Sequence, residues 1–415
     1  MDPQSGDGTL ETASTATRVH ILGAGPVGLL LTALLQPMSG LSVRLYEKRR
    51  EYTRTRMVRL AAYLAADSVE AYRADHFDGD NVEAVFDPEE LAEGLAFRQS
   101  IPSDLMALLR RWSQGFCPLN TIERSLSDLI DARHAHPVQR VAGALTAEDA
   151  IAMLEPGDVL IDCTGSRSLL RDHLAPGSAD ADGDANTLSF VFEHALVVTF
   201  LYGQTYVCNE YCKYYKNVEN PRYKFIPMVH RVCDDGTVSH VTGIVSISAE
   251  EYEAMPKQFD GERLRGNFPN VAQSMDRFID KVKQETHGEL VGDLEVIRIP
   301  LNLYRARNAT SRQYRCAGAG DHPFATTPVF LAGDSAIGSP YFQSISLGFE
   351  CVMFLAGLIA QRDRDASQDM LDRYESYIYK QWLRVYMQSK MIKNNKDLFE
   401  SLDEPIALLD KMHIY

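Results

Sequence analysis

The chain has 415 residues, of which 45% are apolar and 24% are charged. This length is too great for one compact core and is typical of two domains, and the composition excludes a mostly disordered or fibrous protein. With 57 acidic and 42 basic residues the formal net charge is −15, which argues against nucleic acid or an anionic membrane as the main partner.

Neither the first residues nor the cysteines point to secretion. Residues 1–17 lack a basic start and an apolar run, so we interpret them as a solvated tail. Seven scattered cysteines favour reduced thiols over a disulfide framework, and the lone pair Cys208 and Cys212 does not make a metal site. The apolar stretch 347–360 is too short to span a bilayer. We expect a cytoplasmic protein without a metal or a membrane partner.

A glycine turn between a strand and a helix opens the predicted fold. Residues 19–22 form a short apolar strand, GAGPVG follows at 23–28, and residues 29–35 are apolar on all sides, as in a buried helix. In this G-x-G-x-x-G pattern Gly23 permits the tight turn, Gly25 lets a pyrophosphate approach the backbone, and Gly28 lets the helix pack on the strand.

The residues around this turn strengthen the prediction of a dinucleotide site. Pro26 suits the first turn of a helix, whose free N–H groups would face the phosphates. A second strand at 42–46 ends on Glu47, where a carboxylate can accept hydrogen bonds from ribose hydroxyls.

The rest of the chain predicts a second sheet and a helical end. After a strand at 158–162 and a small, acidic linker, residues 187–303 contain short β-type runs and many tyrosines, which indicates an antiparallel sheet. A buried strand at 328–332 and a helix at 347–359 follow. The C-terminal segment has one apolar helical face, made by Leu371, Tyr374, Ile378, Trp382 and Val385.

Four segments, in this order, resemble the flavoprotein monooxygenases of the para-hydroxybenzoate hydroxylase type, which bind FAD. They are 23–28 with Glu47, then 47–56, 158–167 and 330–336. Between the second and third, residues 121–126 occupy the place where the family has an arginine near the cofactor.

The resemblance implies an α/β fold with a Rossmann-like FAD-binding domain, an inserted antiparallel β-sheet substrate domain and C-terminal helices. We expect a disordered tail at 1–17, a discontinuous FAD-binding domain at 18–180 and 318–363, a substrate domain at 181–317 and a helical segment at 364–415. The resemblance also implies the cofactor-binding residues Gly23, Gly25, Pro26, Gly28, Glu47, Lys48, Arg56, Arg124, Thr164, Gly165, Gly333, Asp334 and Gly348.

Near the flavin ring we expect a helix that begins around Ser344, because its positive end would stabilise negative charge on reduced flavin. No catalytic residue is assigned, since family members often need no protein nucleophile. The candidates beside the flavin or in the substrate pocket are Arg56, Pro340, Tyr341 and Phe342.

The sequence departs from the family in two places, and the first of them leaves the electron donor open. The third segment has Thr164 where the family has an aspartate that serves flavin and nicotinamide binding, and Asp162 stands two residues earlier. The electrons could come from NAD(P)H or from a partner flavin reductase. Gln343 and Ser346 replace the two usual glycines of the fourth segment.

The expected function is an FAD-dependent monooxygenase that uses O2 to hydroxylate or epoxidise a small-to-medium organic substrate, with a role in natural-product tailoring. The tyrosines of the second sheet either line a pocket for an aromatic, polyketide or terpenoid-like substrate or form one face of a sheet packed on its neighbours. Arg222 is either a solvated loop residue or, for a substrate with a carboxylate, the nearest cation to anchor it. Two alternatives stay open: a flavin-dependent reductase, dehydrogenase or cyclase on the same fold, and a non-enzymatic dinucleotide-binding scaffold. The substrate and the oligomeric state are left open.

Overall fold

The structure is a computed structural model. It describes residues 16–54, 57–74, 88–115, 117–175, 185–203, 215–216, 223–232, 239–286, 289–316, 320, 322–340, 344–361 and 367–411. The tail predicted at 1–17 lies outside these ranges except for its last two residues, and Thr17 already begins the first strand.

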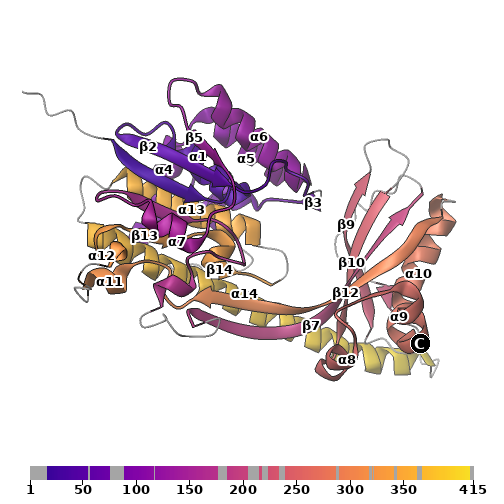
Figure 1. Ribbon diagram of the computed structural model, residues 1–415. Coiled ribbons are helices and arrows are strands. Elements are labelled where there is room, and N and C mark those ends of the chain that lie inside the picture. Colours follow the sequence, from indigo (N-terminus) through magenta and orange to yellow (C-terminus); the bar gives the residue numbers. More distant parts are fainter. Residues whose placement is uncertain are drawn as a thin grey trace, which may run out of the picture.

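A five-stranded sheet forms the centre of the first lobe (Figure 1), with the order β13-β6-β1-β2-β5. All neighbouring strands in it are parallel. Its strands are β1 (Thr17–Leu22), β2 (Leu41–Glu47), β5 (Gln139–Ala142), β6 (Val159–Asp162) and β13 (Val329–Leu331). β6 and β13 are buried throughout and β1 is buried over its last four residues, as expected of a parallel sheet covered by helices on both faces.

Helices cover this sheet. α1 follows the glycine turn and packs against α13, as its apolar surface on all sides predicts. The helices of this lobe are α1 (Pro26–Leu35), η1 (Ala62–Ala65), α2 (Val69–Ala74), α4 (Pro88–Ser100), α5 (Ser103–Gln114), α6 (Leu119–Ala132), α7 (Ala147–Ala152), η2 (Asp172–Leu174), α11 (Arg312–Cys316), α12 (Pro323–Thr326), η4 (Gly333–Ser335) and α13 (Ser344–Ala360). A small hairpin joins β3 (Met57–Val58) to β4 (Cys117–Pro118).

The second lobe is an antiparallel sheet, as predicted, with the order β11-β12-β7-β10-β9-β8. Its strands are β7 (Thr187–Tyr202), β8 (Tyr215–Lys216), β9 (Lys224–Val232), β10 (Ser239–Ile247), β11 (Gln258–Asp260) and β12 (Leu290–Ala306). The helices α8 (Ala249–Ala254), α9 (Gly261–Asn267) and α10 (Pro269–Thr286) belong to this lobe.

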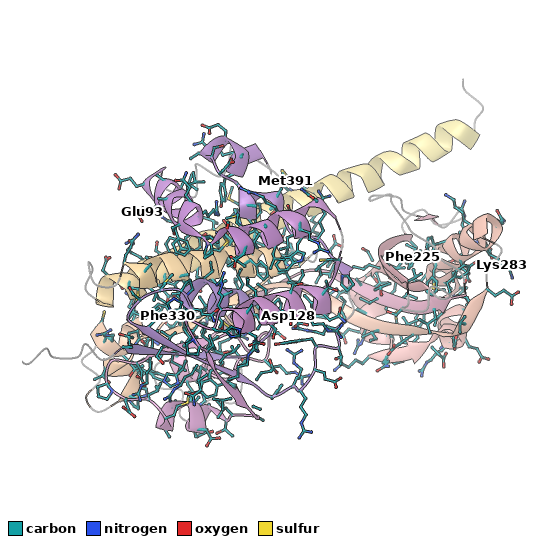
Figure 2. All side chains as sticks on the ribbon, turned by 90° about the horizontal axis from the view of Figure 1, so that it is seen from above. Glu93, Asp128, Phe225, Lys283, Phe330 and Met391 are labelled. Carbon is teal, nitrogen blue, oxygen red and sulfur yellow. The ribbon has the colours of Figure 1, made fainter. Side chains whose placement is uncertain are left out.

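Alternate residues of β7 define the two faces of this sheet. Leu196, Val198 and Phe200 lie in a core cluster with Met275 and Phe278 of α10. Figure 2 shows this cluster around Phe225, separate from the larger core around Phe330 in the first lobe. A smaller apolar group on the second sheet, Ala195, Ile244 and Leu301 with Ile299, lies outside both clusters.

Two long strands belong to both lobes. β7 has 16 residues and β12 has 17, and Figure 1 shows them running side by side toward the first lobe. Phe192 and Leu303 on these strands lie in the core of the first lobe, and β14 (Ile337–Gly338) pairs with β12 there. The connection is thus a packed pair of strands, and the boundaries at 181 and 317 stay a prediction.

The C-terminal helix α14 (Ser367–Lys411) packs against α13 and contacts β7 and β12, and Figure 2 shows its C-terminal part extending to one side of the second lobe. All five residues of its predicted apolar face are buried in the first core. In the part of the chain that the structure describes, no helix combines the length and the apolar character needed to cross a membrane.

Candidate cofactor site

A groove of about 520 Å³ opens at the carboxyl ends of β1, β2 and β6, where ligands bind in open α/β sheets. Its volume is within the range of small-molecule sites. Four stretches of the chain line it: the glycine turn, the segment after β2, the loop after β5 and the loop after β6. Asp334 and Ile345 extend the lining to the start of α13.

The glycine turn leaves room for a ligand at the start of α1. Gly23 has a φ of +93°, and its N–H donates to the Tyr46 carbonyl at 2.8 Å. A Cβ on Gly28 would lie 1.9 Å from the Gly23 carbonyl oxygen, so the helix and the turn touch directly. Gly25 is the N-cap of α1 and makes no side-chain cap hydrogen bond. The positive end of α1 therefore faces the groove.

Glu47 is held at the edge of the groove as a hydrogen-bond acceptor. Its Oε2 accepts the Ala24 N–H at 2.9 Å, and its Oε1 accepts the Arg49 N–H at 2.8 Å. Burial opposes ionisation, but the hydrogen bonds from Arg49 and Ala24 prevail and lower the pKa of Glu47. The charged carboxylate is suited to ribose hydroxyls, which are donors.

A buried carboxylate fixes the far wall of the groove. Asp162 is fully buried and accepts the Thr164 N–H at 2.8 Å and the Thr164 hydroxyl at 2.6 Å. It also accepts hydrogen bonds from Ser168, Leu170 and Ser335. Asp162 is therefore engaged entirely with the protein, and the Thr164 hydroxyl is directed at Asp162.

Two glycines predicted as cofactor contacts instead allow helices to pack around Val27. A Cβ on Gly333, whose φ is +61°, would lie 3.1 Å from Val27, and one on Gly348 would lie 2.8 Å from it. These contacts bring η4 and α13 against α1. Asp334 faces the groove, while its carbonyl accepts hydrogen bonds from Arg171 and Tyr304.

The structure brings together most of the residues predicted for the site. The predicted residues that line the groove are Gly23, Gly25, Pro26, Glu47, Lys48, Thr164, Gly165 and Asp334. Gly28, Gly333 and Gly348 lie behind it at packing positions. Pro340 is buried just after β14 and does not belong to the lining. Arg56, Tyr341, Phe342 and Arg222 lie outside the described residues, as do Tyr206, Tyr211 and Tyr214 of the tyrosine cluster.

Arg124 is the one predicted cofactor residue among those described that lies on the protein surface away from the groove. It is exposed on α6 and is absent from the lining of the groove, because the helix turns its neighbour Glu123 inward instead. The guanidinium that reaches the groove from this side belongs to Arg54, which forms an ion pair with Glu123. Arg49 and Arg54 were part of the resembling segment 47–56, but sequence spacing alone did not distinguish them from Arg56.

The start of α13 lies at one end of the groove, as the sequence predicts. Ile345 lines the groove, and Ser346 accepts the Ala61 N–H at 3.0 Å through its hydroxyl. The Ser346 side chain thus joins α13 to the segment before η1. The groove thus extends from the ribose-type acceptor Glu47, past the α1 N-terminus, to Asp334 and α13. These carboxylate acceptors and this helix N-terminus fit a dinucleotide.

No protein-family model matches the chain, and no curated protein sequence matches it. Solved structures are similar in fold. CabE, an aromatic hydroxylase from angucycline biosynthesis, has 14% identity and a TM-score of 0.50 over 93% of this chain and 73% of its own. The Diels-Alderase PyrE3 of pyrroindomycin biosynthesis has 13% identity and a TM-score of 0.50 over 95% and 78%.

The tetracycline destructase Tet(51) has 10% identity and a TM-score of 0.50, and the match covers 95% of this chain and 97% of that one. The architecture of this chain is therefore the one found in CabE, and the predicted fold class is confirmed. At these identities the similarity establishes the fold, while activity must be argued from the site.

Proposed function

We propose that this protein binds FAD in the groove and is an FAD-dependent monooxygenase acting on an organic substrate. The observation that carries the proposal is the continuous path from Glu47 past Gly25 to Asp334 and the start of α13. Along this path lie an acceptor for the ribose hydroxyls, the N-terminus of α1 for the phosphates, and the N-terminus of α13 for the flavin ring of the cofactor.

Each residue would have a defined task. Glu47 would accept the ribose hydroxyls, the amide groups at the α1 N-terminus would bind the diphosphate, and Asp334 would accept a ribityl hydroxyl. The α13 N-terminus would stabilise negative charge at the ring end. When bound and reduced, FAD supplies the activation of O2. The chain then has to orient the substrate and exclude water.

The substrate site is proposed on the second sheet. Ile299 is half-buried and packs against Ala195, Ile244 and Leu301, outside both large cores, so Ile299 is the apolar side chain of this group that a substrate could contact. CabE acts as an aromatic hydroxylase in angucycline biosynthesis, and Tet(51) is named for tetracycline. The described role of CabE supports an aromatic substrate and a role in natural-product tailoring, and the name of Tet(51) supports a tetracycline-like substrate as a further candidate.

The electron donor is the main open choice, between NAD(P)H bound directly and a partner flavin reductase. Asp162 is fully buried and satisfied by protein donors, so it cannot replace the aspartate that the family has at the position of Thr164. This observation supports a separate reductase.

The first experiment is anaerobic mixing of the FAD-loaded protein with NADH and then with NADPH, while the visible absorbance of oxidised flavin is followed. With a separate reductase, bleaching requires an added flavin reductase, and the reduced protein reoxidises in air. Rapid bleaching by either nucleotide alone would establish a self-sufficient enzyme. A protein that holds no FAD would overturn the proposed function.

A second candidate is a flavin-containing cyclase, because PyrE3 is a Diels-Alderase with the same fold. Oxygen uptake separates the two functions. A monooxygenase consumes one O2 for each product formed, whereas a cyclase forms product without consuming oxygen.

A further inference from the structure

A buried carboxylate beside the groove is not used by the function proposed above. Glu123 on α6 is 0% exposed. Its Oε1 forms an ion pair with Arg54, while its Oε2 has no hydrogen-bond partner in the described structure. Burying a carboxylate is costly unless it is paired, so the ion pair with Arg54 must offset much of that cost.

The partner of this carboxylate lies directly over the glycine turn. The Arg54 Nη2 would be 3.2 Å from a Cβ built on Gly25, and the Arg49 Nη2 would be 4.0 Å from it. Gly25 is where a pyrophosphate must approach the backbone. Two guanidinium groups therefore lie at the place where the negative charge of a diphosphate would be.

α6 holds Arg54 through both its backbone and its side chain. The Asn120 N–H donates to the Arg54 carbonyl at 2.8 Å, and Glu123, on the next turn of the same helix, holds the guanidinium. Without this second contact the side chain, which is 41% exposed, would be free to turn toward solvent. The helix α6 therefore fixes both the backbone of Arg54 and the position of its guanidinium group.

We propose that Glu123 is a positioning residue that holds the Arg54 guanidinium over Gly25, where Arg54 would contact the diphosphate of a bound dinucleotide. This inference rests on the proposed binding of FAD. The planar guanidinium can direct one edge to the carboxylate and another to a phosphate, which an ammonium group cannot do with the same geometry. The chain thus uses an acid on α6 that acts through an arginine of another segment, where the resemblance implies an arginine on α6 itself.

The test compares binding of three ligands to purified full-length variants. FAD contains the adenosine, the diphosphate and the flavin. ADP contains only the adenosine and the diphosphate, and adenosine has no phosphate. FAD binding is followed by flavin fluorescence, and ADP and adenosine are measured as competitors. The variants are Glu123→Gln and Arg54→Lys. The control is Asp128→Asn, the same carboxylate-to-amide change at an exposed position of α6 that Figure 2 labels.

We expect Glu123→Gln and Arg54→Lys each to raise the dissociation constants of FAD and ADP at least tenfold and that of adenosine less than twofold. Asp128→Asn should leave all three dissociation constants at the wild-type level. Arg54 is partly exposed, so its lysine variant should fold even if the buried glutamine does not. Unchanged or tighter ADP binding in either variant would overturn the inference, and so would an equal loss of adenosine, which would indicate a general structural role. If the wild type binds neither FAD nor ADP, the proposed function itself fails.

Discussion

Gly28 is the residue at which the shape of the glycine turn is most constrained. A Cβ at this position would lie 1.9 Å from the Gly23 carbonyl oxygen, which is backbone and cannot rotate away. We expect Gly28→Ala to destabilise the protein by about 3 kcal/mol or more and to abolish FAD binding, because helix and turn must separate. Thermal denaturation with and without FAD checks both effects.

Gly94 provides the matched control, since it also lies inside a helix, α4, but no atom lies within 4 Å of its Cβ position. There the change to alanine should stabilise the protein by up to about 1 kcal/mol, because alanine has the higher helix propensity. Equal melting temperatures for the two variants would show that the contact at Gly28 is not rigid.

The positions of single residues could be predicted where a backbone motif determines them. They could not be predicted where they depend on which side chain of a helix faces the protein interior. The turn at 23–28 and Glu47 follow from spacing alone, and all of them are at the groove or directly behind it. Arg124 was predicted because the family has an arginine in this segment, and Glu123 was not considered. Which of two neighbours on a helix faces inward depends on how α6 packs, and that information lies in the tertiary contacts.

Asp162 joins two elements that are distant in sequence, the loop after β6 and η4. Its five donors include Thr164 and Ser168 in the loop, and Ser335 in η4. An asparagine would present an NH2 group to some of these donors. We expect Asp162→Asn to cost about 3 kcal/mol of unfolding free energy and to weaken FAD binding more than tenfold.

The comparison is Ser168→Ala, which removes only one of these hydrogen bonds and should cost about 1 kcal/mol. Urea denaturation and flavin fluorescence measure the two quantities. If Asp162→Asn has no greater effect than Ser168→Ala, the carboxylate does not hold the two elements together.

A buried ion pair connects α13 to α14. Glu350 is 1% exposed, and its Oε2 accepts a hydrogen bond from Arg384 at 2.8 Å. Its other oxygen accepts the Tyr72 hydroxyl. Burial and the charge of Glu350 hold the pKa of Tyr72 well above its ordinary value, so Tyr72 stays a donor. The sequence showed only an acid inside an apolar helix.

We expect Glu350→Gln to destabilise the protein by about 3–5 kcal/mol, because the buried Arg384 guanidinium loses the charge of Glu350 beside it. The double variant Glu350→Gln with Arg384→Met should lose less than the two single changes together. Asp276→Asn breaks a more exposed pair with Arg265 and should cost less than about 1 kcal/mol. Additive losses in the Glu350 and Arg384 variants, measured by urea denaturation, would contradict the coupling.

The arrangement of the whole molecule was predicted in outline. Alternation of parallel-type and antiparallel-type segments indicated two sheets, and both are present. The sequence did not indicate that β7 and β12 extend into both lobes, because strand length is set by pairing partners far along the chain. Nor did it indicate that β5 completes the first sheet at its edge, since two of its four residues are polar and three are exposed.

The pH dependence of stability should report on His20, which is fully buried at the centre of the first sheet. Its Nδ1 lies 2.9 Å from the Tyr46 hydroxyl and its Nε2 lies 3.2 Å from Asp158, which also binds Arg18. Burial lowers the pKa of His20 below its ordinary value, although the charge of Asp158 opposes the shift.

In the unfolded chain His20 should titrate near its ordinary pKa of about 6.5, so on acidification the unfolded state binds a proton before the folded state does. The stability contributed by His20 is therefore present above about pH 6.5 and is lost as the pH falls toward its lower folded pKa. We expect the melting temperature of the wild type to fall from pH 7 to pH 5, and His20→Gln to show a smaller fall over this range despite a lower melting temperature at pH 7. His134→Gln, at an exposed position, should keep the slope of the wild type. An identical slope in His20→Gln would mean that His20 takes up its proton at the same pH in the folded and unfolded states.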